Sequence, residues 1–178
     1  NRGAHATINE GVALARGRYV AVINSDDAYT PDRIDRCIAA AKQQGSRLVF
    51  TYVEPIDKEG RPLDEGHRWR RWYSEAKRLE RDAVPGIGFV LLTHNIAVST
   101  GNFVFRRDLF DEIGGFEDYR YVHDLDFLLK SVEIEEPMLV RDVLYRYRRH
   151  GANTINVPFE HVDAELKRVF GRYFRSIR

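Results

Sequence analysis

The sequence contains one cysteine, Cys37, and no long apolar segment among its 178 residues. A single thiol excludes an internal disulfide framework and a cysteine-rich zinc or iron–sulfur site, and it fits a reducing compartment. No apolar run approaches the ~18 residues that cross a membrane, and the first residues show no signal-peptide pattern. We therefore expect a cytoplasmic protein without disulfide bonds.

The chain also has almost no net charge and a single methionine. The 28 basic and 27 acidic side chains leave a net charge of +1 at neutral pH. No overall field therefore favours nucleic acid, and we expect no nucleic-acid partner. Met138 is the only methionine, so the chain does not begin at an initiator. We expect this chain to be a piece of a longer protein.

The sequence does contain enough apolar and aromatic material for one domain. It is 43% hydrophobic, with 10 Phe, 9 Tyr and 2 Trp, and a chain of this size buries roughly 70% of its unfolded surface. It has neither internal repeats nor low-complexity linkers. We expect one main unit at residues 1–156 and a distinct C-terminal helix at residues 157–178.

Apolar spacing in the first third alternates between helix and strand. Residues 4–17 have helical spacing, whereas residues 19–23 form an uninterrupted apolar run, which is typical of a strand covered on both faces. A helical stripe follows over residues 30–45 and includes Cys37, which we expect to be buried and inert. Residues 48–53 form a second buried-type strand. Helix and strand in alternation predict an α/β fold.

The remaining patterns continue this alternation. We expect a short helix over residues 107–113, a helix from residue 125 that stops before Pro137, and a strand over residues 143–147. In the last segment apolar residues recur at intervals of three and four positions, which predicts an amphipathic helix. The end of this segment is rich in arginine. The predicted architecture is a mostly parallel sheet flanked by helices.

Two acidic residues, Asp26 and Asp27, follow the predicted strand at residues 19–23. Open α/β sheets bind ligands beyond the carboxyl ends of their strands. Paired carboxylates there supply the hard oxygen ligands that Mg²⁺ or Mn²⁺ prefers, and such ions bridge to phosphates. The alternative is that the doublet only begins a loop before a capped helix. The doublet alone favours the loop.

Another acidic residue, Asp124, precedes the helical stripe that starts at Leu125. It can cap the helix by accepting backbone N–H bonds, or it can accept a proton from an alcohol. Both roles need an ionised carboxylate, so the local pattern does not separate them. Asp126 is a second candidate, one residue further round the helix.

Basic residues lie at the end of the predicted strand at residues 143–147 and directly after it. Arg146, Arg148, Arg149 and His150 form either a solvated basic edge or a clamp on phosphate oxygens. The pattern leaves these two interpretations even.

Short motifs occur in a fixed order along residues 1–156. The first are Asn1-x-Gly3, Asn9-x-Gly11, Ala15-x-Gly17-x-Tyr19 and Asn24-Ser25-Asp26-Asp27. The later ones are Thr100-Gly101-Asn102, Phe105-Arg106-Arg107, Ile113-Gly114-Gly115-Phe116, His123-Asp124-Leu125-Asp126 and Tyr147-Arg148-Arg149-His150. Together they resemble the inverting nucleotide-sugar glycosyltransferases of family 2, which have the GT-A fold. Residues 1–156 would then be a catalytic-core portion.

The resemblance implies a metal-dependent single displacement in polysaccharide biosynthesis. A sugar would move from a nucleoside-diphosphate sugar to a hydroxyl of a glycan, a lipid-linked molecule or another acceptor, with inversion. Asp124 would be the catalytic base, and Asp27 with His150 would hold Mn²⁺ or Mg²⁺. The residues implied at the nucleotide-sugar are Asp26, Asp27, Gly101, Asn102, Arg148 and His150.

The sequence also departs from the family pattern. Asn24 stands where an acidic residue is frequent, His123 where glutamate is common and Lys130 where arginine is frequent. The strands with which the family opens, and which grip the nucleoside, are absent, so the fold is expected to be incomplete on its N-terminal side. One edge of the strand at residues 19–23 would then be uncovered. We predict that the isolated chain is inactive or impaired, and that it forms a homodimer through that edge or represents part of its protein.

Other interpretations stay open at this point. His123-Asp124 also resembles the doublet of the all-helical His-Asp metal phosphohydrolases, although the predicted strands argue against that fold. A non-catalytic acceptor-binding or interaction fragment is a further alternative.

Two segments have uses that the motifs do not assign. The basic segment at residues 67–81 with Trp69 and Trp72 is either an acceptor platform or, slightly favoured, an ordinary amphipathic connector. The arginine-rich last helix either makes peripheral contact with a membrane or, more ordinarily, packs on its own domain or a partner.

Overall fold

A computed structural model describes residues 2–82, 86–151, 153 and 157–177 of the chain. Its helices are α1 (Ala4–Leu14), α2 (Arg33–Gln44), α3 (Arg68–Arg81), α4 (Ile87–Leu91), the 3₁₀ helix η1 (Thr100–Asn102), α5 (Arg107–Ile113), α6 (His123–Ile134) and α7 (Phe159–Ser176). Its strands are β1 (Tyr19–Ala21), β2 (Ala28–Tyr29), β3 (Leu48–Ile56), β4 (Val104–Arg106) and β5 (Met138–Arg148). Asn1, which begins the first motif, and residues 154–156, which hold the predicted domain boundary, lie outside the described residues.

The described strands form one sheet in the order β1-β4-β3-β5-β2. β3 pairs with β5 in parallel, whereas β4 pairs antiparallel with β1 and β3, and β2 pairs antiparallel with β5. β1, β3 and β5 therefore run in one direction, and β2 and β4 run in the other. The predicted α/β class is confirmed. The sheet is mixed rather than mostly parallel, because the reversed strand β4 lies between β1 and β3.

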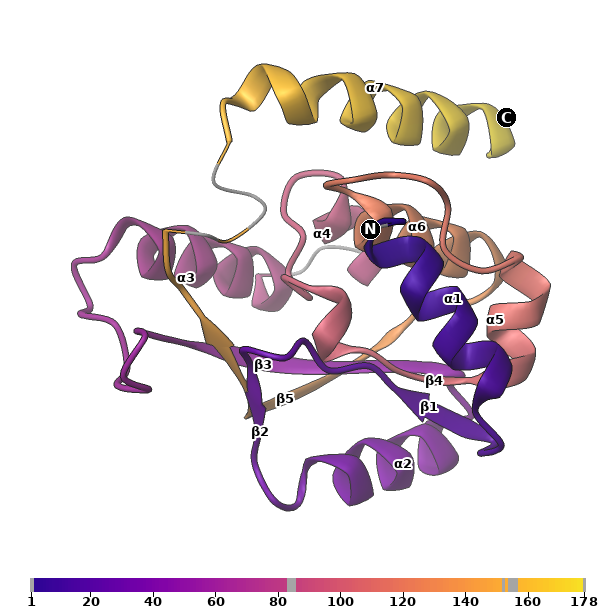
Figure 1. Cartoon of the computed structure of the whole chain (residues 1–178), viewed down its shortest axis with the longest axis horizontal. Helices are drawn as coiled ribbons and strands as arrows, with labels where there is room; N and C mark the ends of the chain where they lie inside the picture. Colours follow the sequence, from indigo (N-terminus) through magenta and orange to yellow (C-terminus); the bar gives the residue numbers. More distant parts are fainter. Residues whose placement is uncertain (1, 83–85, 152, 154–156, 178) are drawn as a thin grey trace.

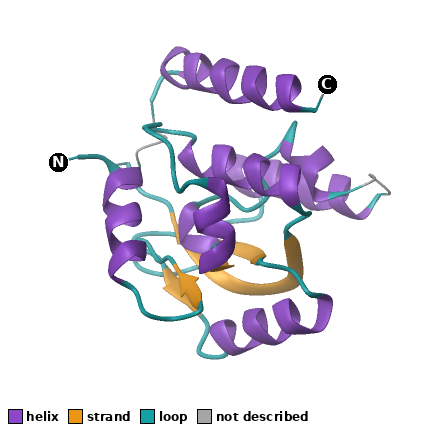
Figure 2. Ribbon diagram, turned by 90° about the vertical axis from the view of Figure 1, so that its right-hand side faces the viewer, coloured by secondary structure: helices purple, strands orange, loops and turns teal. Residues whose placement is uncertain are grey.

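Helices cover both faces of this sheet (Figure 1). α2 lies alone on one face, and the other helices lie on the opposite side, with α7 outermost. Figure 2 shows the same layers after a quarter turn.

The main core lies between the sheet and the larger group of helices. Phe105, Phe116 and Phe127 stack there, with ring centroids 4.3 Å apart for Phe116 and Phe127 and 5.4 Å apart for Phe105 and Phe127. A smaller cluster lies under α2 and includes Cys37, which is fully buried. Burial raises the pKa of the Cys37 thiol, so the prediction of a buried cysteine is confirmed.

Element boundaries differ from the sequence patterns where strands pair. β3 and β5 extend beyond the predicted residues 48–53 and 143–147, because they pair with each other along most of their length. β1 is shorter than the predicted strand and lies at the sheet edge. Its two faces are partly covered, because Val20 packs against the main core and Tyr19 against the cluster under α2. Ile23, just after β1, is 50% exposed. No described strand covers the outer edge of β1, and association through this edge stays a prediction.

α7 packs its apolar side on its own chain, against α6. Val162, Val169 and Tyr173 are its buried residues. Its Glu165 carboxylate accepts hydrogen bonds from the main-chain N–H groups of Arg120 and Tyr121, both at 2.9 Å. None of the helices in the described residues has the length and apolarity needed to cross a membrane. Peripheral contact with a membrane stays a prediction.

A buried polar cluster joins α2, η1 and β3. Arg33 is fully buried, and its guanidinium donates to the main-chain oxygen and to Oδ1 of Asn102, both at 2.6 Å. Asn102 Oδ1 also accepts from the Thr51 N–H at 3.1 Å, and its Nδ2 donates to the Thr51 carbonyl at 2.8 Å. A buried charge is costly unless it is hydrogen-bonded. Asn102 therefore fixes η1 against β3 and α2.

We predict that Asn102→Ala lowers the free energy of unfolding by about 2–4 kcal/mol, because Arg33 loses a side-chain acceptor in the interior. Urea denaturation measures the change. The matched control is Arg36→Ala on the same helix, since the Arg36 side chain is 43% exposed and pairs with exposed Asp32 and Asp142. Equal stability of the two variants would contradict this role.

Candidate functional site

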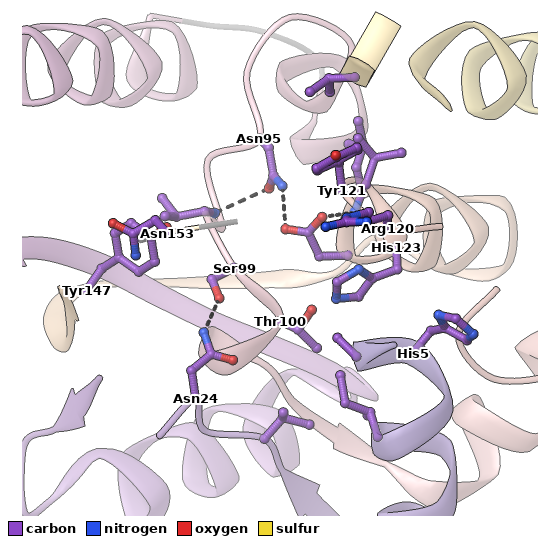
Figure 3. Close-up of a pocket in the computed structure, with 18 of the residues that line it drawn as sticks. His5, Asn24, Asn95, Ser99, Thr100, Arg120, Tyr121, His123, Tyr147 and Asn153 are labelled. Carbon is purple, nitrogen blue, oxygen red and sulfur yellow. Dashed lines mark hydrogen bonds between the residues drawn. The ribbon is translucent and has the colours of Figure 1, made fainter. Parts of the chain in front are cut away.

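A cavity of about 1390 Å³ lies beyond the carboxyl ends of β1 and β5. Asp26 and His150 line it from the loops after these strands, and Asp124 lines it from the start of α6. Residues of α1, α3 and α7 complete the wall. The close-up in Figure 3 shows Asn24 and Ser99 on one side and Asn95, Tyr121 and His123 on another. The cavity thus lies where the strand pattern places a ligand site.

Asp27 ties the loop after β1 to β5. Its Oδ1 accepts from the main-chain N–H of Arg148 at 2.7 Å, and its Oδ2 accepts from the Tyr145 hydroxyl and from Asn24 Nδ2, the latter at 2.9 Å. Burial raises the pKa of the Asp27 carboxyl, the neighbouring Asp26 charge adds to this, and the three donors oppose it. Asp27 does not line the cavity, because these donors hold its carboxylate beneath the wall.

Asn24 explains one departure from the family pattern. Its Nδ2 donates both to Asp27 Oδ2 and to Ser99 Oγ, the latter at 2.8 Å. A carboxylate at position 24 could not donate these bonds and would repel Asp27. The amide therefore suits this position in this chain.

Asp26 and His150 meet on the cavity wall. Asp26 Oδ2 lies 2.9 Å from His150 Nε2, and the two side chains are 37% and 28% exposed. These residues are 124 positions apart in the sequence. The hydrogen bond from the Arg148 N–H to Asp27 brings Asp26 and His150 together. Asp26 directly precedes Asp27, and His150 lies two residues after Arg148.

Arg148 holds the backbone of two loops. Its Nε donates to the Asp26 carbonyl at 2.7 Å, and its Nη1 donates to the carbonyls of Asp57 and Lys58 at 2.8 and 3.0 Å. Arg148 is not on the cavity wall, whereas Arg149 is. The structure therefore gives Arg148 a positioning role for Asp26 and does not bring its guanidinium to the predicted phosphate site.

Gly101 and Asn102 also lie beneath the wall, where Ser99 and Thr100 form the surface instead. A Cβ at Gly101 would clash with the Tyr145 hydroxyl and would lie 3.1 Å from Asn24 Nδ2. Only glycine lets these two side chains reach Asp27 so closely. The structure thus places both residues as supports, and neither reaches the cavity where the sequence motif puts it.

Asp124 is a buried carboxylate held by two donors. Its Oδ1 accepts from the Leu125 N–H at 2.8 Å, and its Oδ2 accepts from Asn95 Nδ2 at 2.9 Å. Burial raises the pKa of Asp124, and the nearby His123, the Leu125 N–H and the Asn95 amide oppose the rise. α6 begins at His123 with Val122 as its N-cap, so the interpretation of Asp124 as the N-cap is wrong.

Asp126 is excluded as an alternative base by its surroundings. It is fully buried and lies 3.2 Å from both Arg172 and Lys130, and it is not on the cavity wall. Lys130 also pairs with Glu117 at 2.8 Å. At the position where the family frequently has arginine, Lys130 therefore forms ion pairs with Asp126 and Glu117.

A divalent cation fits the Asp26 end of the cavity by donor chemistry. The Asp26 carboxylate and the His150 imidazole are oxygen and nitrogen donors that face the cavity together. Asp27 would have to exchange one of its present donors to become a ligand, and a cation bound through His150 Nε2 would have to replace its contact with Asp26 Oδ2. The described residues contain no group of three or more His, Cys, Asp or Glu side chains arranged for a metal, so remaining ligands would come from substrate oxygens and water.

Three side chains with clear roles escaped sequence reasoning. Tyr145 donates to the Asp27 carboxylate and Asn95 to the Asp124 carboxylate. Glu165 accepts from the backbone of the loop before α6. Tyr145 lies in a predicted strand and Glu165 in a predicted helix, but neither pattern indicates a partner over 40 positions away. Asn95 lies in an apolar stretch with no clear periodicity, so no signal could have found it.

The mixed α/β sheet and its flanking helices match a solved structure with a GT-A-like fold. The crystal structure of S. aureus TarS 1-349 in complex with UDP has this fold, with a TM-score of 0.63 and 16% identity, and the match covers 96% of this chain and 45% of that one. The model of glycosyl transferase family 2 matches residues 1–114. The chain therefore belongs to glycosyl transferase family 2.

Curated relatives point to the same family. The succinoglycan biosynthesis protein ExoO of Rhizobium meliloti is 31% identical over 113 residues, which is 62% of this chain and 30% of that protein. The chondroitin synthase of Escherichia coli is 27% identical over 156 residues, which is 86% of this chain and 20% of that protein. This chain spans less than half the length of each of these proteins.

The contact between Asn95 and Asp124 yields a titration test. We predict that Asn95→Ala raises the pKa of Asp124 further, because a donor to the charged carboxylate is lost while the burial remains. Carboxyl ¹³C NMR of labelled aspartate measures this change. Thr93→Ala is the matched control, since Thr93 lines the same cavity without bonding Asp124. An unchanged titration in Asn95→Ala would contradict the assigned contact.

Proposed function

We propose that this chain is the catalytic-core portion of an enzyme that transfers a sugar from a nucleoside-diphosphate sugar to an acceptor hydroxyl. Family membership supports sugar transfer, and TarS was crystallised with UDP. The main observation in support is that Asp124, Asp26 and His150 line one cavity. A base and a phosphate-side group are the two functions that such a transfer needs.

Asp124 is proposed as the base that takes the proton of the acceptor hydroxyl. It faces the cavity, and its donors favour the ionised form against the effect of burial. As the hydroxyl oxygen bonds to the anomeric carbon, the bond from that carbon to the diphosphate breaks, and its electron pair leaves with the diphosphate. One base on the acceptor side and one leaving group on the other support a direct displacement with inversion.

Asp26 and His150 are proposed to hold a divalent cation with the diphosphate. When bound, Mn²⁺ or Mg²⁺ would neutralise the charge that develops on the leaving group. Arg149 lines the cavity beside His150 and can pair with phosphate oxygens. Asp27 stays a predicted ligand, although its present bonds favour the role of fixing Asp26.

Two relatives are named for polysaccharides, succinoglycan and chondroitin. These names support a glycan acceptor and a place in polysaccharide biosynthesis for the protein that contains this chain. The phosphohydrolase alternative is wrong, because it requires an all-helical domain and this chain has a five-stranded sheet. A non-catalytic fragment stays an alternative that the activity test below decides.

We predict that Asp124→Asn lowers the transfer rate of the protein at least ~10²–10⁴-fold while leaving UDP binding unchanged. Release of UDP from UDP-sugars in the presence of acceptor measures the rate. Asp118→Asn is the matched control, because Asp118 lines the same cavity and, among the described residues, forms an ion pair with His5 at 3.3 Å. Full activity of Asp124→Asn would remove the base assignment, and no transfer by the unmodified protein would favour the non-catalytic alternative.

Cation binding tests the other end of the cavity without turnover. We predict that Asp26→Ala and His150→Ala each weaken binding of Mn²⁺ in the presence of UDP by at least about tenfold, since each removes one donor. Electron paramagnetic resonance of free Mn²⁺ measures the binding. Asp32→Ala, at an exposed carboxylate beside α2, is the control. Loss in Asp27→Asn with no loss in Asp26→Ala would make Asp27 the ligand instead.

A further inference from the structure

One part of the cavity wall is aromatic and distinct from the carboxylates. Trp69 and Trp72 project from α3, and Tyr147 comes from the end of β5. Leu92 and Thr93 continue this surface. We call Trp69, Trp72 and Tyr147 the aromatic wall. The sugar-transfer chemistry described above uses none of these side chains.

The aromatic wall is held by stacking on both sides of Trp69. The Trp69 ring stacks on Tyr73 at 5.0 Å and 24° and on Tyr147 at 6.0 Å and 27°. Trp72 stacks on His94 at 5.8 Å and 30°, and His94 itself is not on the wall. Trp72 is nevertheless 37% exposed. A rigid indole supported from one side and open on the other is a surface for a flat ligand face.

The aromatic wall lacks the positive charge of its own helix. None of the described basic side chains of α3 lines the cavity. Arg70 donates to the Leu63 carbonyl at 2.6 Å, and Arg78 pairs with Glu75 at 2.6 Å. Lys77 lies over the Tyr52 and Tyr73 rings. The basic side chains of this segment are therefore directed away from the cavity. Arg149, on the proposed phosphate side, lies over the Tyr147 ring at 6.0 Å. The part of the aromatic wall that α3 supplies, Trp69 and Trp72, receives no charge from its own helix, which favours a neutral ligand there.

One short segment contacts both the aromatic wall and the proposed base. His94 stacks on Trp72, and the next residue, Asn95, donates to Asp124 Oδ2. Trp72, Asn95 and Asp124 all line the same cavity. A ligand stacked on Trp72 would thus share the cavity with Asp124.

We infer that the aromatic wall is the acceptor subsite and that it takes a neutral pyranose ring of a glycan. That the bound sugar is the acceptor rests on the proposed function. That the aromatic wall binds a sugar is argued from its side chains alone. A pyranose has an apolar C–H face that stacks on an indole and a rim of hydroxyls that hydrogen-bond. Of the described residues, none accepts a hydrogen bond from the indole N–H of Trp69 or Trp72, so both donors are available to such hydroxyls.

The tryptophans provide their own probe. Trp69 and Trp72 are the only two tryptophans in the sequence, so tryptophan emission, excited at a wavelength that tyrosine does not absorb, reports on this wall alone. We expect a saturable change in emission with at least one of three neutral disaccharides, chitobiose, cellobiose and maltose, with a Kd of about 1 mM. Absence of a saturable change with all three would overturn the inference.

Matched variants locate the binding. Trp72→Ala leaves Trp69 as the reporter and is expected to weaken disaccharide binding about three- to tenfold, whereas Trp72→Phe keeps an aromatic face and weakens it less. Arg71→Ala, at an exposed neighbour on the same helix, is expected to bind as the unmodified chain does. Equal binding by Trp72→Ala and the unmodified chain would overturn the inference.

A nucleobase is the rival occupant, because it also stacks on aromatic rings. An emission change with UDP that is lost in Trp72→Ala, and competition between UDP and the disaccharide, would assign the wall to the nucleobase and overturn the inference. We expect UDP and the disaccharide to bind together.

Transfer kinetics separate this inference from the proposed function. In the transferring protein, Trp72→Ala is expected to raise the acceptor KM three- to tenfold with an unchanged donor KM. If no transfer occurs at all, the proposed function fails while disaccharide binding by the wall still stands. If Asp124→Asn abolishes transfer but Trp72→Ala changes only the donor KM, the subsite assignment fails and the proposed function stands.

Discussion

Asp27 places a negative charge beneath the cavity, and the rest of the site depends on how that charge is held. Its donors come from the loop after β1 and from β5, and the contact with the Arg148 N–H spans 121 positions. A buried carboxylate without donors is costly, so these two segments are held together wherever the fold forms. This tie brings Asp26 beside His150 and requires a glycine at position 101.

A second support system holds the opposite side of the cavity in the same way. Asn95 fixes the Asp124 carboxylate, and Glu165 on α7 fixes the loop that leads into α6. The two cavity carboxylates are thus each held by polar partners. Arg148 holds the Asp26 backbone from beneath the wall, and Asn95, which is itself on the wall, holds Asp124. Such partners keep the two carboxylates in fixed positions at the edge of the sheet, which the proposed transfer chemistry requires.

Sequence reasoning succeeded where a local pattern determines the position. Asp26 lies on the cavity wall because polar residues directly follow a strand, and α5 spans its predicted residues because a helical stripe ends at a left-handed Gly114. It did not predict the reversed strand β4, the burial of Asn102 or the position of Arg148 away from the cavity wall. Those features depend on contacts between segments that are distant in the sequence. A motif identifies a residue, but it does not indicate whether the side chain faces the ligand or holds another side chain that faces it.

The account's central claim is that one cavity holds the cation and the diphosphate at Asp26 and His150 and places the transferred sugar toward Asp124. A crystal structure of the protein grown with Mn²⁺ and UDP tests it most directly, using anomalous scattering at the manganese absorption edge. The account predicts a manganese peak within coordination distance of Asp26 and His150, with the diphosphate bound to it. A peak or a nucleotide elsewhere on the molecule, with this cavity empty, would contradict it.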